Sequence, residues 1–101
     1  MKKFKFDEHP KANAYYVEYY SDLEGKYYDL YSYETLVARC IINENIIIRI
    51  TGLYSITTRK HIGWWLKMLY KKENINLNYY DIKRAYEKGD YIKNNIHIRR
   101  G

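Results

Sequence analysis

The feature that most constrains this fold is a period-two pattern in two tyrosine-rich segments early in the chain. Between Asn13 and Tyr20, aromatic and β-branched residues alternate along the sequence, and the pattern resumes from Tyr27 to Tyr33. Residues of these types in alternation favour strands. Because the turn-rich segment 21–26 separates the two runs, they predict an antiparallel hairpin.

Two short apolar runs follow, at residues 35–42 and 46–51, and both are rich in β-branched residues. Only Asn43, Glu44 and Asn45 separate them, which predicts a second hairpin. Consecutive short connections favour a meander. We therefore predict a three- to four-stranded antiparallel meander sheet with one face left to be covered.

An amphipathic helix is predicted to cover that face. Apolar residues recur at helical spacing after residue 57, at Ile62, Trp65, Leu66 and Leu69. This stripe is expected to face the sheet. Gly52 marks the end of the strand region, and Thr57 is the predicted N-cap of the helix.

A second, shorter helix is predicted further along the chain. Asn78 is followed three residues later by Asp81, an arrangement typical of a capping box, and Gly89 suits the position just after a helix. The fold class is therefore α+β, with a C-terminal amphipathic helix and a shorter helix over the sheet. Two interpretations fit residues 95–101: an edge strand, or a frayed basic end.

The length of 101 residues predicts a single domain over residues 1–101. We divide it into an N-terminal lead-in (1–12), a β-sheet (13–54), a helical half (57–89) and a basic tail (90–101). No apolar run is long enough for a membrane span or a signal peptide. The one cysteine, Cys40, lies in an apolar run, which is typical of a buried structural thiol. These features predict a cytoplasmic protein without a membrane partner.

The basic charge of the chain is concentrated in its second half. Residues 1–57 carry 7 Lys or Arg against 8 Asp or Glu, whereas residues 58–101 carry 11 against 4. A local excess of this kind favours anionic partners. Part of it also has a compositional explanation, because Ile, Lys, Asn and Tyr, which A/T-rich codons encode, supply 47 of the 101 residues.

Patterns that carry catalysis are absent from the sequence. It contains no Gly-rich phosphate loop, no paired cysteines and no Gly-flanked nucleophilic serine. The three histidines are far apart in sequence, and His61, one turn into the predicted helix, is expected to hydrogen-bond a backbone carbonyl. We predict that the protein is not an enzyme and has no catalytic residue, metal or cofactor.

The exposed side of the first predicted helix is the main candidate binding surface. Lysines alternate with a tryptophan at spacings of three and four residues, with further basic residues at either end. The predicted partner-binding residues are Arg59, Lys60, Trp64, Lys67, Lys71 and Lys72. Such a face could hold phosphates while the indole stacks on a base or enters a protein pocket. A solvated lysine face with Trp64 over the edge of the core fits the pattern equally well.

Tyrosine supplies a second candidate surface. The chain has 14 tyrosines, more than one small core is expected to absorb, so one row should remain exposed. The residues proposed for it are Tyr16, Tyr20 and Tyr28, with the basic Arg99 and Arg100 of the tail. Cross-strand tyrosine pairs that only stabilise the sheet are the alternative. An exposed tyrosine-rich edge allows either a monomer or a homodimer.

Two segments of the chain resemble a known pattern. Residues 32–38 read Ser-Tyr-Glu-Thr-Leu-Val-Ala, and residues 52–62 read Gly-Leu-Tyr-Ser-Ile-Thr-Thr-Arg-Lys-His-Ile. Together they resemble the motif S-Y-x-T-x-V-A, then G-x-Y-S-x-T-T-x-x-H-I, of small uncharacterised proteins of bacteriophages and other mobile elements in low-GC Gram-positive bacteria. The resemblance covers residues 15–69. The motif residues sit where they can cap and brace the strand-to-helix turn, so a folding role also fits them.

The resemblance implies a class of function. It suggests a compact phage accessory protein that binds a host protein or nucleoprotein complex and inhibits it, such as an anti-CRISPR protein acting on a CRISPR–Cas effector. The alternative is a direct DNA- or RNA-binding protein that uses the basic Lys and Trp helix face. Salt dependence separates the two, because direct phosphate binding weakens steeply as ionic strength rises.

Overall fold

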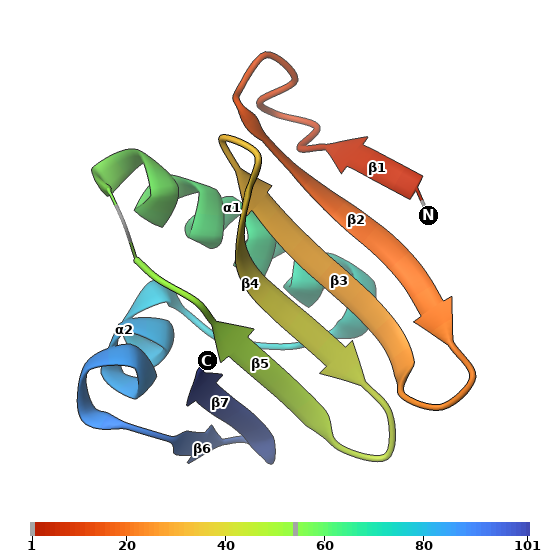
Figure 1. The fold of residues 1–101 in the computed structure, drawn as a ribbon, viewed down its shortest axis with the longest axis vertical. Coiled ribbons are helices and arrows are strands. Elements are labelled where there is room, and N and C mark those ends of the chain that lie inside the picture. Colours follow the sequence, from red (N-terminus) through yellow and green to blue (C-terminus); the bar gives the residue numbers. More distant parts are fainter. Residues whose placement is uncertain (1, 54) are drawn as a thin grey trace.

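Seven strands and two helices form in the part of the chain that the computed structural model describes, residues 2–53 and 55–101 (Figure 1). In chain order they are β1 (Lys2–Lys5), β2 (Ala14–Ser21), β3 (Gly25–Ser32), β4 (Thr35–Ile42), β5 (Ile46–Ile50), α1 (Ile56–Glu73), α2 (Tyr79–Lys88), β6 (Tyr91–Lys93) and β7 (Ile96–Arg100). Both hairpins and both helices predicted from the sequence are present.

The strands form one mixed sheet in the order β1-β2-β3-β4-β5-β7-β6. Neighbours are antiparallel except β5 and β7, which are parallel. The predicted three- to four-stranded meander is therefore wrong as a description of the whole sheet. It matches only β2 to β5, because β1 extends one side and the β6–β7 hairpin extends the other. The overall class is still α+β.

The basic tail forms a strand of the sheet and contributes to the hydrophobic core. β7 lies between β5 and β6, so it is not an edge strand, and it is not frayed. Ile96 and Ile98 are buried, and Ile98 pairs with Ile48 of β5. Asn94 and Asn95 both have positive φ and join β6 to β7 in a tight turn, as such turns require. The lead-in likewise holds a strand, β1, on the opposite edge of the sheet.

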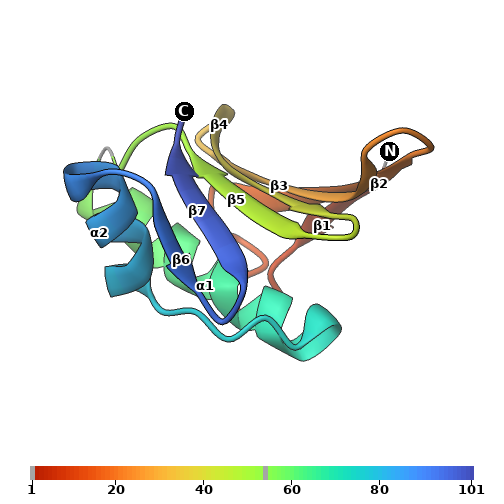
Figure 2. The same ribbon diagram turned by 90° about the horizontal axis from the view of Figure 1, so that it is seen from below.

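Both helices pack on the same face of the sheet (Figure 2). The predicted stripe of α1 is buried against it, with Ile62, Trp65 and Leu69 fully enclosed. The N-cap is Ser55, whose Oγ accepts a hydrogen bond from the Thr58 backbone N–H at 3.2 Å, so the prediction of Thr57 is wrong by two residues. The hydroxyl of residue 55 reaches the third helical N–H, which is the usual capping geometry.

The second helix begins as predicted. Asn78 is its N-cap, and Asn78 and Asp81 exchange the two hydrogen bonds of a capping box. Gly89 ends the helix with a φ of 103°, a conformation that only glycine adopts without strain. Buried side chains from the sheet and both helices form one hydrophobic cluster, which includes Cys40. No helix among the described residues is long and apolar enough to cross a membrane.

Candidate functional site

A groove of about 650 Å³ lies along the outer side of α1. The segment after β1 forms one wall and the linker between α1 and α2 forms the other. The residues that line it are Lys5, Phe6, Asp7, Glu8, His9, Tyr16, Gly63, Trp64, Leu66, Lys67, Met68, Tyr70, Lys71, Lys72, Asn76, Leu77, Asn78 and Tyr79. We call this hollow the α1 groove.

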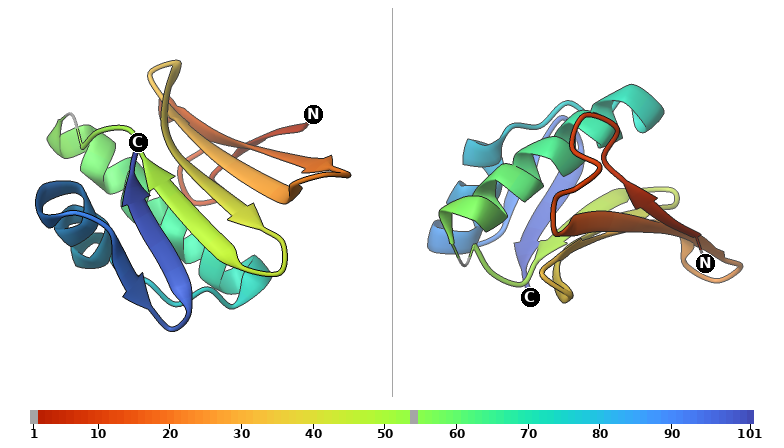
Figure 3. Two further views of the ribbon diagram at one scale, coloured as in Figure 1. Left: turned by 60° about the horizontal axis from the view of Figure 1, so that its bottom comes forward. Right: turned by 90° about the horizontal axis from the view of Figure 1, so that it is seen from above.

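The N-terminal wall is held in place by a chain reversal. The backbone N–H of His9 donates to the Phe6 carbonyl at 2.8 Å, and the two residues form an isolated β-bridge. Phe6 is buried and packs on Trp64 in a T-shaped arrangement, with ring centroids 6.0 Å apart. Figure 3 shows this segment curling from β1 towards α1. The wall is therefore anchored by aromatic packing on the helix.

Four of the six predicted helix-face residues line this groove together: Trp64, Lys67, Lys71 and Lys72. Lys67 and Lys71 are exposed and have no ion-pair partner within the described ranges. Lys72 differs, because its ammonium lies over the Phe4 ring at 5.2 Å. The three helix lysines of the groove therefore comprise two without an ion-pair partner among the described residues and one held against an aromatic ring, while Lys5 of β1 donates to the Ala12 carbonyl at 2.8 Å.

The other two predicted residues, Arg59 and Lys60, are exposed but do not line the groove. Both lie near the start of α1. The Arg59 guanidinium lies 5.9 Å from the centre of the Tyr79 ring, so it packs on the start of α2. The predicted basic residues therefore form two groups on α1, one near its start and one at the groove.

Trp64 is half-buried and one face of its ring is already occupied. The His9 ring stacks on the indole with centroids 3.7 Å apart and an interplanar angle of 10°. His61 lies 5.0 Å from the same ring. The indole is therefore part of the groove wall, and it is not the open stacking plate that the sequence suggested.

The predicted tyrosine surface does not exist as one exposed row. Tyr16 and Tyr28 are buried beneath α1, and only Tyr20 is exposed, at 74%. Arg99 and Arg100 point to opposite faces of the sheet, as consecutive strand residues must. On the helix side, Arg100 donates from Nη1 to the Tyr86 carbonyl at 3.3 Å. The register of β2 and β3, which the sequence did not fix, buries the tyrosines that we expected outside.

Tyr28 instead ties the end of α1 to the sheet. Its hydroxyl donates to Glu73 Oε2 at 2.6 Å, and Lys26 Nζ donates to the same oxygen at 2.9 Å. Burial tends to raise the pKa of Glu73, but these two donors outweigh it and lower the pKa below its usual value. The carboxylate is thus held in its charged form at the last turn of the helix.

The motif residues form a largely buried hydrogen-bonded network at the other end of α1. His61 Nδ1 lies 2.7 Å from Ser32 Oγ, and Ser32 Oγ lies 3.3 Å from Thr58 Oγ1. Ser55 Oγ reaches the same Thr58 hydroxyl at 3.2 Å. The predicted partner of His61, a backbone carbonyl, is replaced by the Ser32 side chain. The network joins the end of β3 to the start of α1; Tyr54 of the motif lies outside the described residues.

Three of the four residues in this network, Ser32, Thr58 and His61, are buried, and Ser55 is exposed. His61 is 2% exposed and Ser32 is 3% exposed. Burial lowers the pKa of His61, and the nearby charge of His9 lowers it further. The buried contact between Ser32 and His61 joins β3 to α1, so it suits bracing of the strand-to-helix turn. Among the described residues, no group of three or more His, Cys, Asp or Glu side chains could hold a metal ion.

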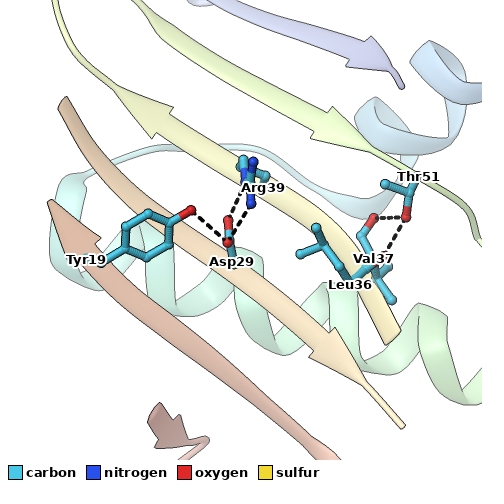
Figure 4. A network of polar contacts seen from close by, with 6 residues as sticks. All are labelled: Tyr19, Asp29, Leu36, Val37, Arg39 and Thr51. Carbon is cyan, nitrogen blue, oxygen red and sulfur yellow. Dashed lines mark hydrogen bonds and ion pairs between the residues drawn. The ribbon is translucent and has the colours of Figure 1, made fainter. Parts of the chain in front are cut away.

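A second polar cluster, missed from the sequence, lies on the opposite face of the sheet (Figure 4). Asp29 of β3 is 2% exposed and receives two hydrogen bonds from Arg39, at 2.8 and 3.0 Å. The Tyr19 hydroxyl donates to the same carboxylate at 3.1 Å. Burial, followed by the charge of Asp29, raises the pKa of Tyr19 to about 12. The only sequence signal was an aspartate in a tyrosine-rich strand.

Comparisons with known proteins place the chain in a family. No curated protein and no solved structure matches it. The matched family model spans residues 8–83, a range that holds the Ser32–His61 network and all of α1 but leaves β1, β6 and β7 outside. Because this match covers most of the chain, the protein belongs to the family of unknown function DUF8033.

Proposed function

We propose that this protein acts by stoichiometric binding of a macromolecular partner, and that the α1 groove makes the contact. One observation carries the proposal: Trp64, Lys67, Lys71 and Lys72 line a single groove of about 650 Å³. Hollows of this size, with aromatic walls and a few polar groups, are typical binding sites.

The chemistry of the groove describes the segment that would fit it. Leu66 and Met68 contribute to the lining although they are largely buried, so an apolar side chain can pack there. Lys67 and Lys71 supply two exposed ammonium groups at the same groove. A matching segment therefore combines an apolar anchor with neighbouring carboxylates.

A protein segment fits this groove better than a nucleic acid strand. Stacking on a base needs an open aromatic face, and the His9 ring already occupies one face of Trp64. Asp7 and Glu8 also line the N-terminal wall, so the regularly spaced phosphates of a strand lying along the groove would meet their carboxylates, whereas a peptide can place its acidic side chains at Lys67 and Lys71 alone. These contacts favour a protein partner over direct DNA or RNA binding at this helix.

For the partner itself, we propose a host defence nucleoprotein, such as a CRISPR–Cas effector, which the protein inhibits in the bacterial cytoplasm. The support is the small size, the basic second half of the chain and the motif that resembles those of phage accessory proteins. A basic binder is suited to the acidic or nucleic-acid-filled surfaces of such complexes.

Gly63 offers a sharp test, because it lines the groove and a Cβ added there meets nothing within 4 Å. Gly63→Gln is expected to project a side chain into the groove without loss of stability, since glutamine is a better helix former than glycine by about 0.5 kcal/mol or more. Gly63→Ala is the matched control. The two variants and the wild type are used to capture partners from lysate of a low-GC Gram-positive host.

The partner in question is the one retained by the wild type and by Gly63→Ala but lost by Gly63→Gln. Calorimetry with that purified partner should give a fixed molar ratio and at least a tenfold weaker affinity for Gly63→Gln. Equal affinity of all three proteins would show that the groove is not the contact. A groove-dependent partner that is neither a nucleoprotein nor one of its components would disprove the proposed partner class.

A further inference from the structure

One whole face of the sheet is left uncovered by the helices. Figure 2 and Figure 3 show α1 and α2 on one side of the strands, and no helix or strand of residues 2–53 and 55–101 packs over the other side. Side chains alternate between the two faces along each strand. On β4, for example, Cys40 points into the core and its neighbour Arg39 points away from it. We call the uncovered side the open face.

Three arginines form a row across the open face. Arg39 of β4 pairs with Arg49 of β5, and Arg49 pairs with Arg99 of β7. Residues directly opposite one another on neighbouring strands share a face, and the strands lie about 4.8 Å apart. The three arginine side chains therefore leave the same face of the sheet from paired positions on three adjacent strands.

Most of this charge is not neutralised within the protein. Arg39 is paired with the buried Asp29 carboxylate. Arg99 has a single contact of 4.0 Å to an Asp90 side chain that is itself 72% exposed, and Arg49 has no ion pair in the parts of the chain that the structure describes. Like charges opposite one another destabilise a sheet, so an anion bound across Arg49 and Arg99 relieves this repulsion.

An apolar and aromatic row runs directly beside the arginines. Two residues away along each strand, Ile41 pairs with Ile47, and Ile47 pairs with His97. All three side chains are partly exposed. Beyond them, Ile92 of β6 pairs with His97 and is 63% exposed. A row of cations thus lies parallel to a row of flat or apolar groups on one surface.

We propose that the open face binds single-stranded nucleic acid, with Arg49 and Arg99 on the backbone phosphates and the bases over Ile47 and His97. Guanidinium groups match phosphates in charge and in bidentate geometry. Unpaired bases expose flat faces that pack on apolar and aromatic side chains, whereas a duplex hides them. This site is separate from the α1 groove, which lies on the other side of the molecule.

The test measures binding of labelled 12-nucleotide single strands, one of RNA and one of DNA, by fluorescence anisotropy over a range of salt. The double variant Arg49→Gln, Arg99→Gln is expected to bind at least tenfold more weakly than the wild type. It should also lower the slope of log affinity against log salt by about 1.4, because each phosphate contact contributes about 0.7 for single strands. His97→Ala should weaken binding with little change in that slope.

Two control variants test whether the loss of binding is specific to the open face. Lys88→Gln removes one positive charge from an exposed position on α2, and Gly63→Gln alters the α1 groove. Both are expected to bind the strands as the wild type does, which makes this proposal independent of the proposed function. The ratio of RNA to DNA affinity reports whether the 2′-hydroxyl is recognised.

Three results would overturn the proposal. One is that neither strand binds at low salt. Another is that the arginine double variant binds as tightly as the wild type, or that Lys88→Gln, which removes one charge instead of two, lowers the affinity and the salt slope by half as much as the double variant, which would show that only net charge matters. The last is that a duplex of the same length, or a polyglutamate chain, binds as tightly as the single strands, because the bases would then contribute nothing.

Discussion

A few buried polar side chains fix the position of α1 on the sheet and the register of the central strands. The contact between Ser32 and His61 joins β3 to the start of α1. The contact between Tyr28 and Glu73 joins β3 to the end of α1. Asp29 links β2, β3 and β4. An unpaired buried polar group costs about 1–3 kcal/mol. These contacts therefore select one register and one helix position over alternatives with the same apolar pattern.

The His61 contact predicts a pH dependence of stability. Because the pKa of His61 is lowered in the folded state, the unfolded chain, with a histidine pKa of about 6.5, binds more protons just below that pH. The free energy of unfolding should thus fall as the pH drops from about 7 through that window. For His61→Asn, which cannot titrate, urea unfolding at pH 7.5, 6.5 and 5.5 should show a smaller decline. Parallel curves for the two proteins would contradict this.

The Asp29 cluster predicts a strong dependence on its cation. Arg39→Met leaves a carboxylate with a side chain only 3% exposed without its charged partner, and we expect a loss of roughly 3 kcal/mol in the free energy of unfolding. The double variant Asp29→Asn, Arg39→Met should recover part of that loss, because no buried charge remains. Urea unfolding of the wild type, Arg39→Met, Asp29→Asn and the double variant measures both effects. Additive losses would argue against the coupling.

At the level of elements, α2 depends on its first turn. Asn78→Ala removes the side chain that accepts from the Asp81 N–H at 3.1 Å, and we expect a loss of about 1 kcal/mol in the free energy of unfolding. Asn76→Ala, an exposed linker position two residues earlier, is the matched control and should change stability by less than about 0.5 kcal/mol. Chemical unfolding monitored by circular dichroism compares them. Equal losses for both variants would remove the role of the capping box.

Elements with a local signal were predictable from the sequence, and those without one were not. The β2–β3 and β4–β5 hairpins have turn residues between alternating runs, and the Asn78 box lies within four residues. β7 pairs with β5 across an insertion that contains both helices, so no short-range pattern marks it. β1 is short and rich in lysine. This composition protects an edge strand from pairing with other chains, but it also lacks the apolar alternation by which a strand is predicted.

The same distinction holds for the candidate sites. Trp64 and the groove lysines could be grouped in advance, because helical spacing places residues three and four apart on one side. The stacking of His9 on Trp64 joins positions 55 residues apart, from a loop to a helix, and needs the tertiary fold. The arginine row needs the registers of β4, β5 and β7 at once, and a shift of one residue would turn its members to the other face.

At the scale of the whole molecule, the C-terminal hairpin is expected to be essential for folding. A chain that ends at Gly89 loses β6 and β7, and with them the buried side chains of Ile96 and Ile98. Burial of each such side chain contributes about 1.5–3 kcal/mol, a large share of the stability of a small domain. We expect residues 1–101 to unfold in a cooperative thermal transition when followed by circular dichroism, and the 1–89 fragment to lack that transition. A cooperative transition in the fragment would disprove this.

Because Cys40 is buried, the rate at which its thiol is alkylated reports on the stability of the fold. Its thiol is fully buried in β4, and burial raises its pKa to about 12, so the nucleophilic thiolate is scarce while the native state persists. The chain contains one cysteine, and any alkylation therefore reports a single site. Under native conditions, the rate of modification by iodoacetamide should follow how often the central strands separate. A mass shift measured over time would thus rank variants of this protein without denaturant.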